Sequence, residues 1–384
     1  MKIKGKWISP ILLGFLIVLG GVLLWRFYFM GFFHHSPLSG SGNLYPRFSY
    51  EDRRGVNART VLYALEEGKW EKEGEGIPAY LSYRGFCPEE EGEALEEEGY
   101  DDSLLLLSQS FPQGRVYVYD TPPEESLHWR VLLTQEDDDD FQTFALEKTS
   151  AFESIVDWGP WEKGIYFYRY PEKGDPFLTL LDLNTGKTQD KPISFSALDE
   201  HSQVEKRGLY DDIRDRLLFF YTRGSETQGN EKLLGQYDFA TGQLFSLPLT
   251  QPVSHLLMTP EGYFLANTSS LRQVILYSYD FDWKEKDSIT YHLDIPQDEI
   301  EVWQGCPFLV MEGGVLYGYL EGSRQSKLPG DWGMRDCFYA LDTGSGQLLS
   351  LHFIRPGWGF LLQGVELLAE EGETPAFYTL PSGF

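Results

Sequence analysis

Tryptophan and arginine residues at six positions are the side chains best suited to bind a ligand. Aromatic faces pack against sugars and peptides and attract cationic groups. The tryptophans lie next to glycine or proline, in segments typical of connections between strands. The predicted ligand-binding residues are Trp158, Trp161, Trp332, Trp358, Arg335 and Arg355. Because large aromatic side chains also dominate core burial, packing between structural units is the alternative for the tryptophans.

Motifs for covalent catalysis and for zinc or nucleotide binding are not found in the sequence. The histidines are scattered, and they form no HExxH motif and no pair at helical spacing. No G-x-S-x-G, G-x-G-x-x-G or Walker loop occurs. No catalytic residue and no metal-ligating residue is therefore predicted. Paired carboxylates that cleave glycans stay an open alternative, because acids are abundant and the sequence does not give their distances.

An acidic run is the feature that most suggests a bound cation. Residues Glu136 to Asp140 are all acidic, and Ca²⁺ takes about six to eight oxygen ligands. Adjacent side chains of a run diverge, however, so a solvated loop is the main interpretation. The segment from Asp182 to Gly186 is interpreted as a turn, in which the acidic side chain bonds its own backbone and glycine adopts a positive φ. The sequence predicts no cofactor, with Ca²⁺ as the alternative.

A short pattern recurs along the chain: an apolar run ends in an acidic residue, and a glycine turn follows. The acidic residues of its copies are Glu66, Asp120, Asp182, Asp238, Asp280 and Asp342. The copy Asp342-Thr343-Gly344 is interpreted as a shortened turn. Such repetition indicates that one supersecondary unit is used several times.

The repeating unit is clearest between Val253 and Leu293. Four short runs separated by turn residues predict strands at 254–258, 263–267, 274–281 and 288–293. Four short strands in about 40 residues are typical of one propeller blade. Aromatic and β-branched residues favour further strands at 165–170, 177–183, 217–221, 233–239 and 315–320.

With these repeats, about residues 100–384, or 56–384 at the widest, resemble bacterial β-propeller proteins with PQQ-like or WD-like blades. The resemblance rests on the Asp-x-x-Thr-Gly turns that begin at Asp182 and Asp238. It implies an all-β fold, a six- or seven-bladed β-propeller, whose N-terminal strand residues pair with the last blade and so remove free edges. Residues 89–102 are strongly acidic and predict an exposed insertion, with a short helix as the alternative.

The N-terminal region predicts a membrane anchor. Lys2, Lys4 and Lys6 precede an apolar run from Ile8 to Trp25, which has about the length that spans a hydrocarbon core. We therefore expect a single N-terminal transmembrane helix before the propeller, with a cytoplasmic N-terminus and an extracytoplasmic C-terminal domain at the cell membrane. A cleaved signal peptide is the alternative. The expected division is a cytoplasmic tail and anchor at 1–33, a flexible tether at 34–55 and the propeller at 56–384.

The chain is strongly acidic, with a formal net charge of −27. This charge disfavours nucleic acid as a partner and is compatible with a cationic ligand or a basic protein surface. Cys87, Cys306 and Cys337 form no CxxC motif. Because Cys306 and Cys337 fall in one repeat unit, a disulfide between them and buried free thiols both stay open.

The sequence supports three hypotheses about function. The first is a membrane-anchored binding module outside the membrane: a scaffold, assembly factor or sensor that recognises a protein, peptide or glycan. The second is an extracellular hydrolase or lyase that acts on glycans through carboxylates around the central channel. The third is a structural surface protein without a concave pocket. The missing catalytic motifs favour the first hypothesis over the enzyme.

Overall fold

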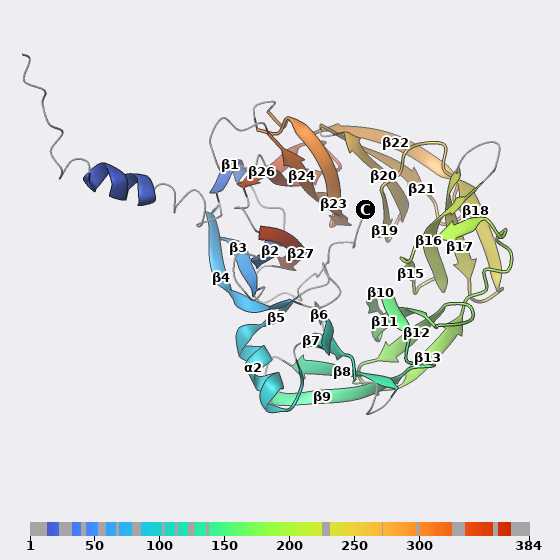
Figure 1. The fold of residues 1–384 in the computed structure, drawn as a ribbon. Helices are drawn as coiled ribbons and strands as arrows, with labels where there is room; N and C mark the ends of the chain where they lie inside the picture. The colour runs from blue at the N-terminus through green and yellow to red at the C-terminus, as the bar shows by residue number, and fades with distance from the viewer. Residues whose placement is uncertain are drawn as a thin grey trace, which may run out of the picture.

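The computed structural model describes most of the chain between residues 14 and 369. The described residues are 14–22, 33–39, 44–52, 59–66, 69–78, 86–101, 104–111, 114–121, 127–135, 138–224, 231–270, 272–296, 299–324, 335–355 and 360–369. In this part of the chain, six antiparallel sheets of four or five strands surround a central axis (Figure 1). Hydrophobic side chains pack between neighbouring sheets. The fold is therefore an all-β propeller, and each sheet is a blade.

Four blades are built from strands that follow one another along the chain. The first contains β6 (Leu105–Phe111), β7 (Gly114–Tyr119), β8 (His128–Gln135) and β9 (Asp138–Glu147). The second contains β10 (Ser154–Trp161), β11 (Gly164–Tyr170), β12 (Phe177–Asp182) and β13 (Thr188–Pro192). The third contains β14 (Ser202–Val204), β15 (Leu209–Asp211), β16 (Arg216–Arg223), β17 (Glu231–Asp238) and β18 (Gln243–Pro248). The fourth contains β19 (His255–Thr259), β20 (Gly262–Ser270), β21 (Gln273–Tyr279) and β22 (Glu285–His292).

The two remaining blades combine strands from both ends of the chain. One contains β23 (Val302–Glu312), β24 (Val315–Ser323), β25 (Asp336–Asp342) and β26 (Leu348–Arg355), and β1 (Phe33–Ser39) pairs with the outer edge of β26. The other contains β2 (Leu44–Asp52), β3 (Arg59–Glu66), β4 (Lys69–Pro78) and β5 (Phe86–Pro88), and β27 (Phe360–Ala369) is its innermost strand (Figure 1). The predicted closure by N-terminal strand residues is confirmed. We call the interface between the β23–β26 blade and the β2–β5 blade the seam.

The strand predictions are confirmed where the pattern was clearest. The unit between Val253 and Leu293 forms the four strands β19 to β22 in one sheet. The aromatic and β-branched runs form β11, β12, β16, β17 and β24. These strands are almost fully buried in the middle of their blades, as the burial of β11 and β24 shows. Their composition therefore reflects burial on both faces of the sheet.

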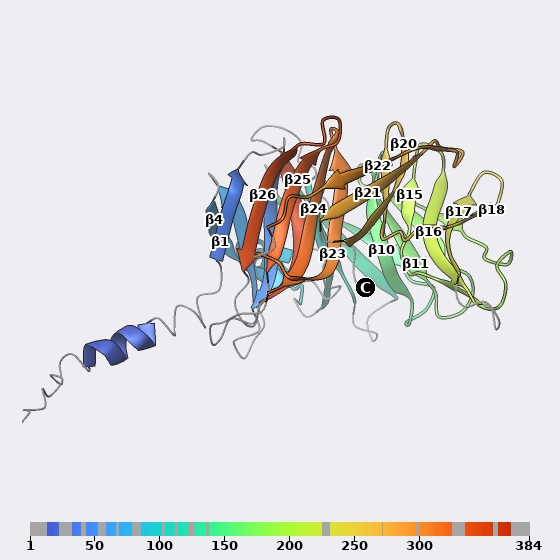
Figure 2. The ribbon, with the colours of Figure 1, turned by 90° about the horizontal axis from the view of Figure 1, so that it is seen from above.

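The predicted fold class is wrong, because it included a single transmembrane helix before the propeller. The described strands form six sheets and no seventh. Among the described residues, no helix is long and apolar enough to cross a membrane. The described helix at 14–22 stands away from the ring (Figure 2). At 1.5 Å per residue it is about 13 Å long, whereas a hydrocarbon core is about 30 Å thick.

Two further predictions about the N-terminal half need correction. The expected flexible tether at 34–55 contains β1 and β2, because backbone pairing with β26 and β27 compensates for the polar composition. The expected exposed insertion at 89–102 contains helix α2 (Glu89–Glu97). Leu95 anchors this helix, since its side chain is buried against a core that includes Cys87 and Tyr117. One apolar residue among many acids is enough to dock the helix.

The repeated acidic residue organises the turn between the third and fourth strands of a blade. Asp182 Oδ1 accepts hydrogen bonds from the amides of Asn184 (2.9 Å) and Thr185 (3.2 Å), and Gly186 has a φ of 68°. These bonds confirm the predicted turn, which needs no cation. Desolvation alone would raise the pKa of Asp182, but the hydrogen bonds from Thr185 and Asn184 together outweigh it and lower the pKa below its usual range.

Two copies of the pattern differ from the prediction. The turn at Asp342 is not shortened, because Ser345 takes the threonine position and donates through its amide (2.6 Å) and hydroxyl (2.7 Å) to Asp342 Oδ1. Gly346, with a φ of 71°, is then the turn glycine. Asp120 follows β7, the second strand of its blade, where it accepts a bond from the Thr121 amide (2.8 Å). Asp120 therefore follows a second strand, whereas the other copies follow the third strand of their blades.

Candidate functional site

The two ends of the propeller differ in how the strands are connected. At the turn end, short turns join the first strand of a blade to the second and the third to the fourth. At the connection end, longer segments join the second strand to the third and each blade to the next. The longest segments between strands within a blade lie at the connection end, at 120–127, 224–230 and 324–335. Loops on a rigid scaffold are the usual place for binding residues.

The structure does not bring the predicted ligand-binding residues together. Arg335 directly precedes β25 and Arg355 ends β26, so both lie at the connection end. Trp161 ends β10 and lies at the turn end. Trp332 and Trp358 lie outside the described residues. A single site that combines Trp161 with the two arginines is therefore excluded by the topology.

Trp158 and Trp161 both take part in packing between strands and blades. Trp158 is 5% exposed, and its indole Nε1 donates to Oε1 of Gln109 (2.7 Å), which belongs to β6 of the neighbouring blade. Trp161 Nε1 donates to the carbonyl of Leu181 (3.2 Å) within its own blade. The alternative interpretation of these two residues, packing between structural units, agrees with their contacts.

A buried polar chain that the sequence did not reveal crosses the seam near the connection end. Tyr319 on β24 donates to Oδ2 of Asp336 at the start of β25 (2.6 Å). The hydroxyl of Tyr50 on β2 lies 2.7 Å from the hydroxyl of Tyr319. All three residues are at most 3% exposed. Arg335, one of the predicted residues, is also buried next to Asp336, and its amide donates to the carbonyl of Gly322 (3.0 Å).

Burial controls the protonation of this chain. Desolvation raises the pKa of Asp336 to about 8, and the charge of Glu321 raises it further, against the bonds from Tyr319 and the Gly322 backbone. Desolvation also raises the pKa of Glu321, which is half-buried on β24. The pKa of Tyr319 is raised, first by burial and then by the charge of Asp336. At neutral pH, Asp336 is therefore mostly a neutral carboxylic acid.

A neutral carboxylic acid at pH 7 is what a glycosidase uses as a general acid. Such a group must reach the substrate, but Asp336 is 3% exposed and bonded to Tyr319. The arrangement therefore suits a structural role better than proton transfer to a ligand. In the sequence, the available signal is an acidic residue that directly begins the apolar run of β25.

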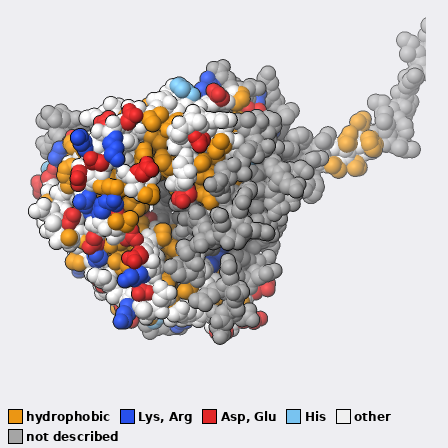
Figure 3. Space-filling model, turned by 180° about the vertical axis from the view of Figure 1, so that it is seen from behind, with side chains coloured by type: hydrophobic (Ala, Val, Ile, Leu, Met, Phe, Trp, Pro, Cys, Tyr) orange, Lys and Arg blue, Asp and Glu red, His pale blue; other side chains and the backbone are white. Residues whose placement is uncertain are grey.

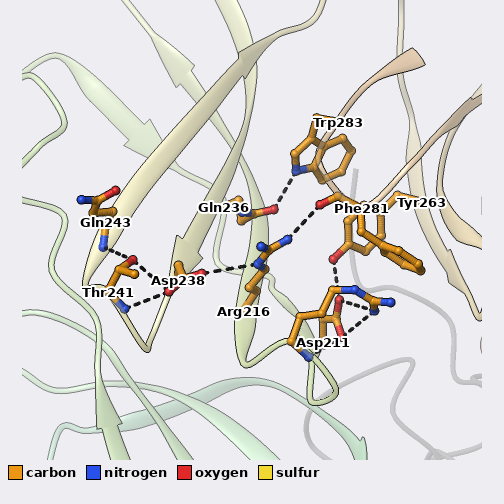
Figure 4. A network of polar contacts seen from close by, with 10 residues as sticks. Asp211, Arg216, Gln236, Asp238, Thr241, Gln243, Tyr263, Phe281 and Trp283 are labelled. Carbon is orange, nitrogen blue, oxygen red and sulfur yellow. Dashed lines mark hydrogen bonds and ion pairs between the residues drawn. The ribbon is translucent and has the colours of Figure 1, made fainter. Parts of the chain in front are cut away.

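A second polar network joins the β14–β18 blade to the β19–β22 blade at the turn end (Figure 4). Tyr263 on β20 donates to Oδ2 of Asp211 on β15 (2.5 Å), and Asp211 also pairs with Arg214 (3.1 Å). Arg216 on β16 donates to the carbonyl of Phe281 (2.8 Å). Asp211 is fully buried, so its two partners replace the water that it loses.

Trp283 completes this junction from a strained backbone conformation. Its φ is 62°, which is uncommon for a bulky residue. Its indole stacks on Tyr263, with ring centroids 4.6 Å apart, and donates to Oε1 of Gln236 (2.7 Å) on the neighbouring blade. The Trp283–Gln236 and Trp158–Gln109 pairs therefore use the same contact at two junctions between blades.

Large apolar side chains are exposed at the connection end. Leu127 precedes β8, Phe152 precedes β10 and Val302 begins β23, so they come from three blades. Their exposed fractions are 44%, 77% and 56%. At the turn end, Ile213 is 79% exposed. On the face shown in Figure 3, positive and negative side chains are mixed with hydrophobic ones over the described part.

The described residues contain no group of three or more His, Cys, Asp or Glu side chains that could hold a metal ion. Of the acidic run, Glu136 lies outside the described residues and Asp140 belongs to β9. The three cysteines are free and buried, so Cys306 and Cys337 are not bridged. Burial raises the pKa of the Cys306 thiol to about 12, which makes it a poor nucleophile.

Comparisons with known proteins identify no family for this chain. No protein-family model matches it, and no curated protein matches its sequence. One similar solved structure is a hypothetical selenium-binding protein from Sulfolobus tokodaii, with 12% identity over 84% of this chain and 78% of that chain and a TM-score of 0.41. Another is the β-propeller domain of the Trilobed protease from Pyrococcus furiosus, with 11% identity over 90% of this chain and 98% of that chain and a TM-score of 0.40. A third is the WD40 domain of SCAP from fission yeast, with 9% identity over 88% of this chain and 92% of that chain and a TM-score of 0.39. At such identities and TM-scores, these similarities carry no conclusion about activity.

Proposed function

We propose that this protein is a propeller binding module, a scaffold, assembly factor or sensor that recognises its partner at the connection end. The observation that carries the proposal is the exposure of Leu127, Phe152 and Val302 at this end. Exposed apolar side chains that come from separate blades and face one end give a rigid ring several anchor points for a partner. The strand ends that the longest segments within blades join lie at the same end.

The proposed partner is a protein, a peptide or a glycan. The formal charge of −27 disfavours nucleic acid and favours a partner with basic groups around its contact surface. Apolar anchors on a chain of negative net charge suit a basic protein surface best, because hydrophobic contacts give affinity and opposite charges speed association. A glycan partner would use aromatic faces, as first expected for the tryptophans.

Affinity capture with the full chain tests the proposal. A solubilised envelope fraction and a glycan array serve as the sources of partners. We expect capture of a specific partner, and we expect a variant with Phe152→Ser and Val302→Ser to lose it by tenfold or more. The matched control is Ile213→Ser, which removes an exposed apolar residue at the turn end and keeps binding. Equal loss in both variants, or binding that neither variant changes, would contradict the proposed face.

The same experiment separates binding from catalysis. The enzyme alternative requires that a captured glycan is cleaved, and that cleavage is lost when Glu321 becomes Gln. Glu321 is the half-buried carboxyl with a raised pKa near the connection end. Stable retention of the partner supports the binding module.

We further propose that the N-terminal segment associates with a lipid surface. The described helix at 14–22 exposes six large apolar side chains, from Phe15 to Val22, with exposed fractions of 42–66%. Lys2, Lys4 and Lys6 precede it and would attract anionic headgroups. Flotation of the full chain with anionic vesicles tests this, and a variant with Leu16→Ser and Ile17→Ser should remain with the unbound fraction. The location of the propeller outside the cytoplasm stays a prediction.

A further inference from the structure

The seam is the place where both ends of the chain close the ring. β1 pairs with β26 on one side, and β27 pairs with β2 on the other. A shared hydrophobic cluster fills the interface, and it includes Phe48 and Tyr50 from β2 and Tyr319 and Phe338 from the opposite blade. The ring centroid of Phe48 lies 5.3 Å from the ring centroid of Tyr319 and 5.7 Å from the ring centroid of Phe338. The polar chain from Tyr50 to Asp336 therefore lies beside this apolar cluster.

The polar chain makes this apolar interface sensitive to one proton. Tyr50 belongs to one blade, and Tyr319 and Asp336 belong to the other, so the hydroxyl contact of 2.7 Å links the two blades. The Asp336 carboxyl is buried, and among the described residues no basic side chain forms an ion pair with it. An ionised carboxylate in such a place lacks a counter-charge, and burying it costs several kcal/mol.

We propose that Asp336 is a proton-controlled latch of the seam: the ring is closed there while the carboxyl carries its proton, and loss of the proton favours local opening between β2 and β24. The opening exposes the carboxylate to water, which removes the cost of burying its charge. This regulation goes beyond the proposed binding function and does not depend on it. It would make the connection end near β24 and β25 more mobile in alkaline solution.

Desolvation and the charge of Glu321 raise the pKa of Asp336, whereas the hydrogen bonds from Tyr319 and the Gly322 backbone lower it. Glu321 approaches from β24, and its negative charge disfavours a second one on Asp336. The phenols of Tyr319 and Tyr50, from β24 and β2, stay neutral because burial raises the pKa of each. Cys337, the next residue on β25, also stays neutral, since burial raises the pKa of its thiol. Within the part of the chain that the structure describes, the surroundings therefore offer Asp336 hydrogen bonds and no ion pair.

The sign of the pH dependence follows from these directions. The folded pKa of Asp336 lies above its unfolded value of about 3.9. The contribution of this group to stability is thus present at low pH and is lost as the pH rises towards the folded pKa. Between the unfolded and folded pKa values, each pH unit favours the opened, ionised seam by up to about tenfold, and the dependence levels off above the folded pKa because the closed carboxyl is then ionised too.

Hydrogen exchange of the full chain between pH 6 and pH 9 tests the latch. After correction for the intrinsic exchange rate, protection of amides in β2 and β24 should fall by about tenfold between pH 7 and pH 9. Amides in β11 and β16, far from the seam, serve as the internal reference and should keep their protection. In Asp336→Asn, which keeps a neutral side chain at this site, β2 and β24 should show no such fall.

Two further variants keep the test decisive if Asp336→Asn fails to fold. Glu321→Gln removes a negative neighbour and lowers the pKa of Asp336, so the loss of protection should level off at a lower pH and be smaller in total. Tyr50→Phe removes the hydroxyl contact but not the carboxyl, so protection at the seam should be lower at every pH, with the same dependence on pH. A fall that is equal in all blades, a fall that persists in Asp336→Asn, or a levelling-off pH that Glu321→Gln leaves unchanged would overturn the proposal.

Discussion

At the residue scale, the turn pattern shows how one side chain can organise a backbone. Asp182, Asp238 and Asp342 each accept hydrogen bonds from a Thr or Ser three residues later, and a glycine with positive φ follows. The side-chain bonds take the place of the ladder bonds that end at the turn. This turn was predictable at Asp182 and Asp238, because its chemistry lies in five consecutive residues.

The turn at Asp342 gives a matched pair of variants. Gly346 has a φ of 71°, so Gly346→Ala should lower the free energy of unfolding by about 1 kcal/mol through backbone strain. Gly344→Ala should change it by a few tenths of a kcal/mol at most, because the nearest atom to the added methyl group lies 3.6 Å away. Urea unfolding at 25 °C measures both. A larger loss for Gly344→Ala would mean that the turn is the shortened one that the sequence indicated.

The two buried networks could not be predicted at this scale. Trp283 lies three residues after Asp280, at the position where the turns that begin at Asp182, Asp238 and Asp342 have Thr or Ser. Nothing local indicates that a bulky residue there would adopt a φ of 62°. Its partner Gln236 is 47 positions away in sequence. Likewise, Asp336 finds Tyr50 through Tyr319, and Tyr50 and Tyr319 are 269 positions apart. Contacts at this separation depend on how the blades pack, and local patterns in the sequence do not show which distant residues will meet.

At the element scale, strands were predictable where both faces are buried. β11 and β24 consist mainly of aromatic and aliphatic residues in a row, because neighbouring blades cover them on both sides. The strands at the outer edge were harder: β22 is exposed at seven of eight positions, and β13 has no buried residue. The tether prediction failed for the same reason, because β1 gains its order from backbone bonds to β26.

Removing the two closing strands should have unequal effects. β27 is an inner strand with Leu362, Val365 and Leu367 buried, whereas β1 adds to an outer edge. A chain that ends before residue 360 should therefore lose cooperative thermal unfolding. A chain that begins after residue 39 should still unfold cooperatively, with a Tm lower by a few degrees. Calorimetry with circular dichroism measures both, and equal losses would show that the outer strand is as necessary as the inner one.

At the scale of the whole molecule, a buried histidine should limit stability in acid. Burial lowers the pKa of His255 to about 4, and its Nδ1 lies 3.0 Å from the Ser254 hydroxyl. Because the unfolded pKa is about 6.5, the unfolded state binds more protons between pH 6.5 and pH 4, and stability falls as the pH falls through this range. The free energy of unfolding should fall by about 1 kcal/mol per pH unit. The positive charges of Arg207 and Lys232 add to this loss, because they repel the protonated imidazole.

Urea midpoints of the protein and of His255→Asn, measured from pH 7 to pH 4, test this effect. The variant should lose less stability than the unmodified chain over this range, because asparagine does not titrate. Parallel losses in both proteins would assign the acid sensitivity to other groups.

The general architecture was accessible from the sequence, but the site was not. Repeats and strand spacing indicated a propeller, because each blade is a local unit. The ligand-binding prediction gathered residues by type, and the topology separates Trp161 from Arg335 and Arg355. The exposed residues Leu127, Phe152 and Val302 carry no motif, and only their common position at the connection end distinguishes them.

The most direct test of the binding face is a hydrogen-exchange footprint of the full chain with its captured partner. The account predicts that the partner protects peptides that contain Leu127, Phe152 and Val302, and that the peptide containing Ile213 at the turn end exchanges as in the free protein. Protection centred on Ile213, with unchanged exchange at the connection end, would contradict the account.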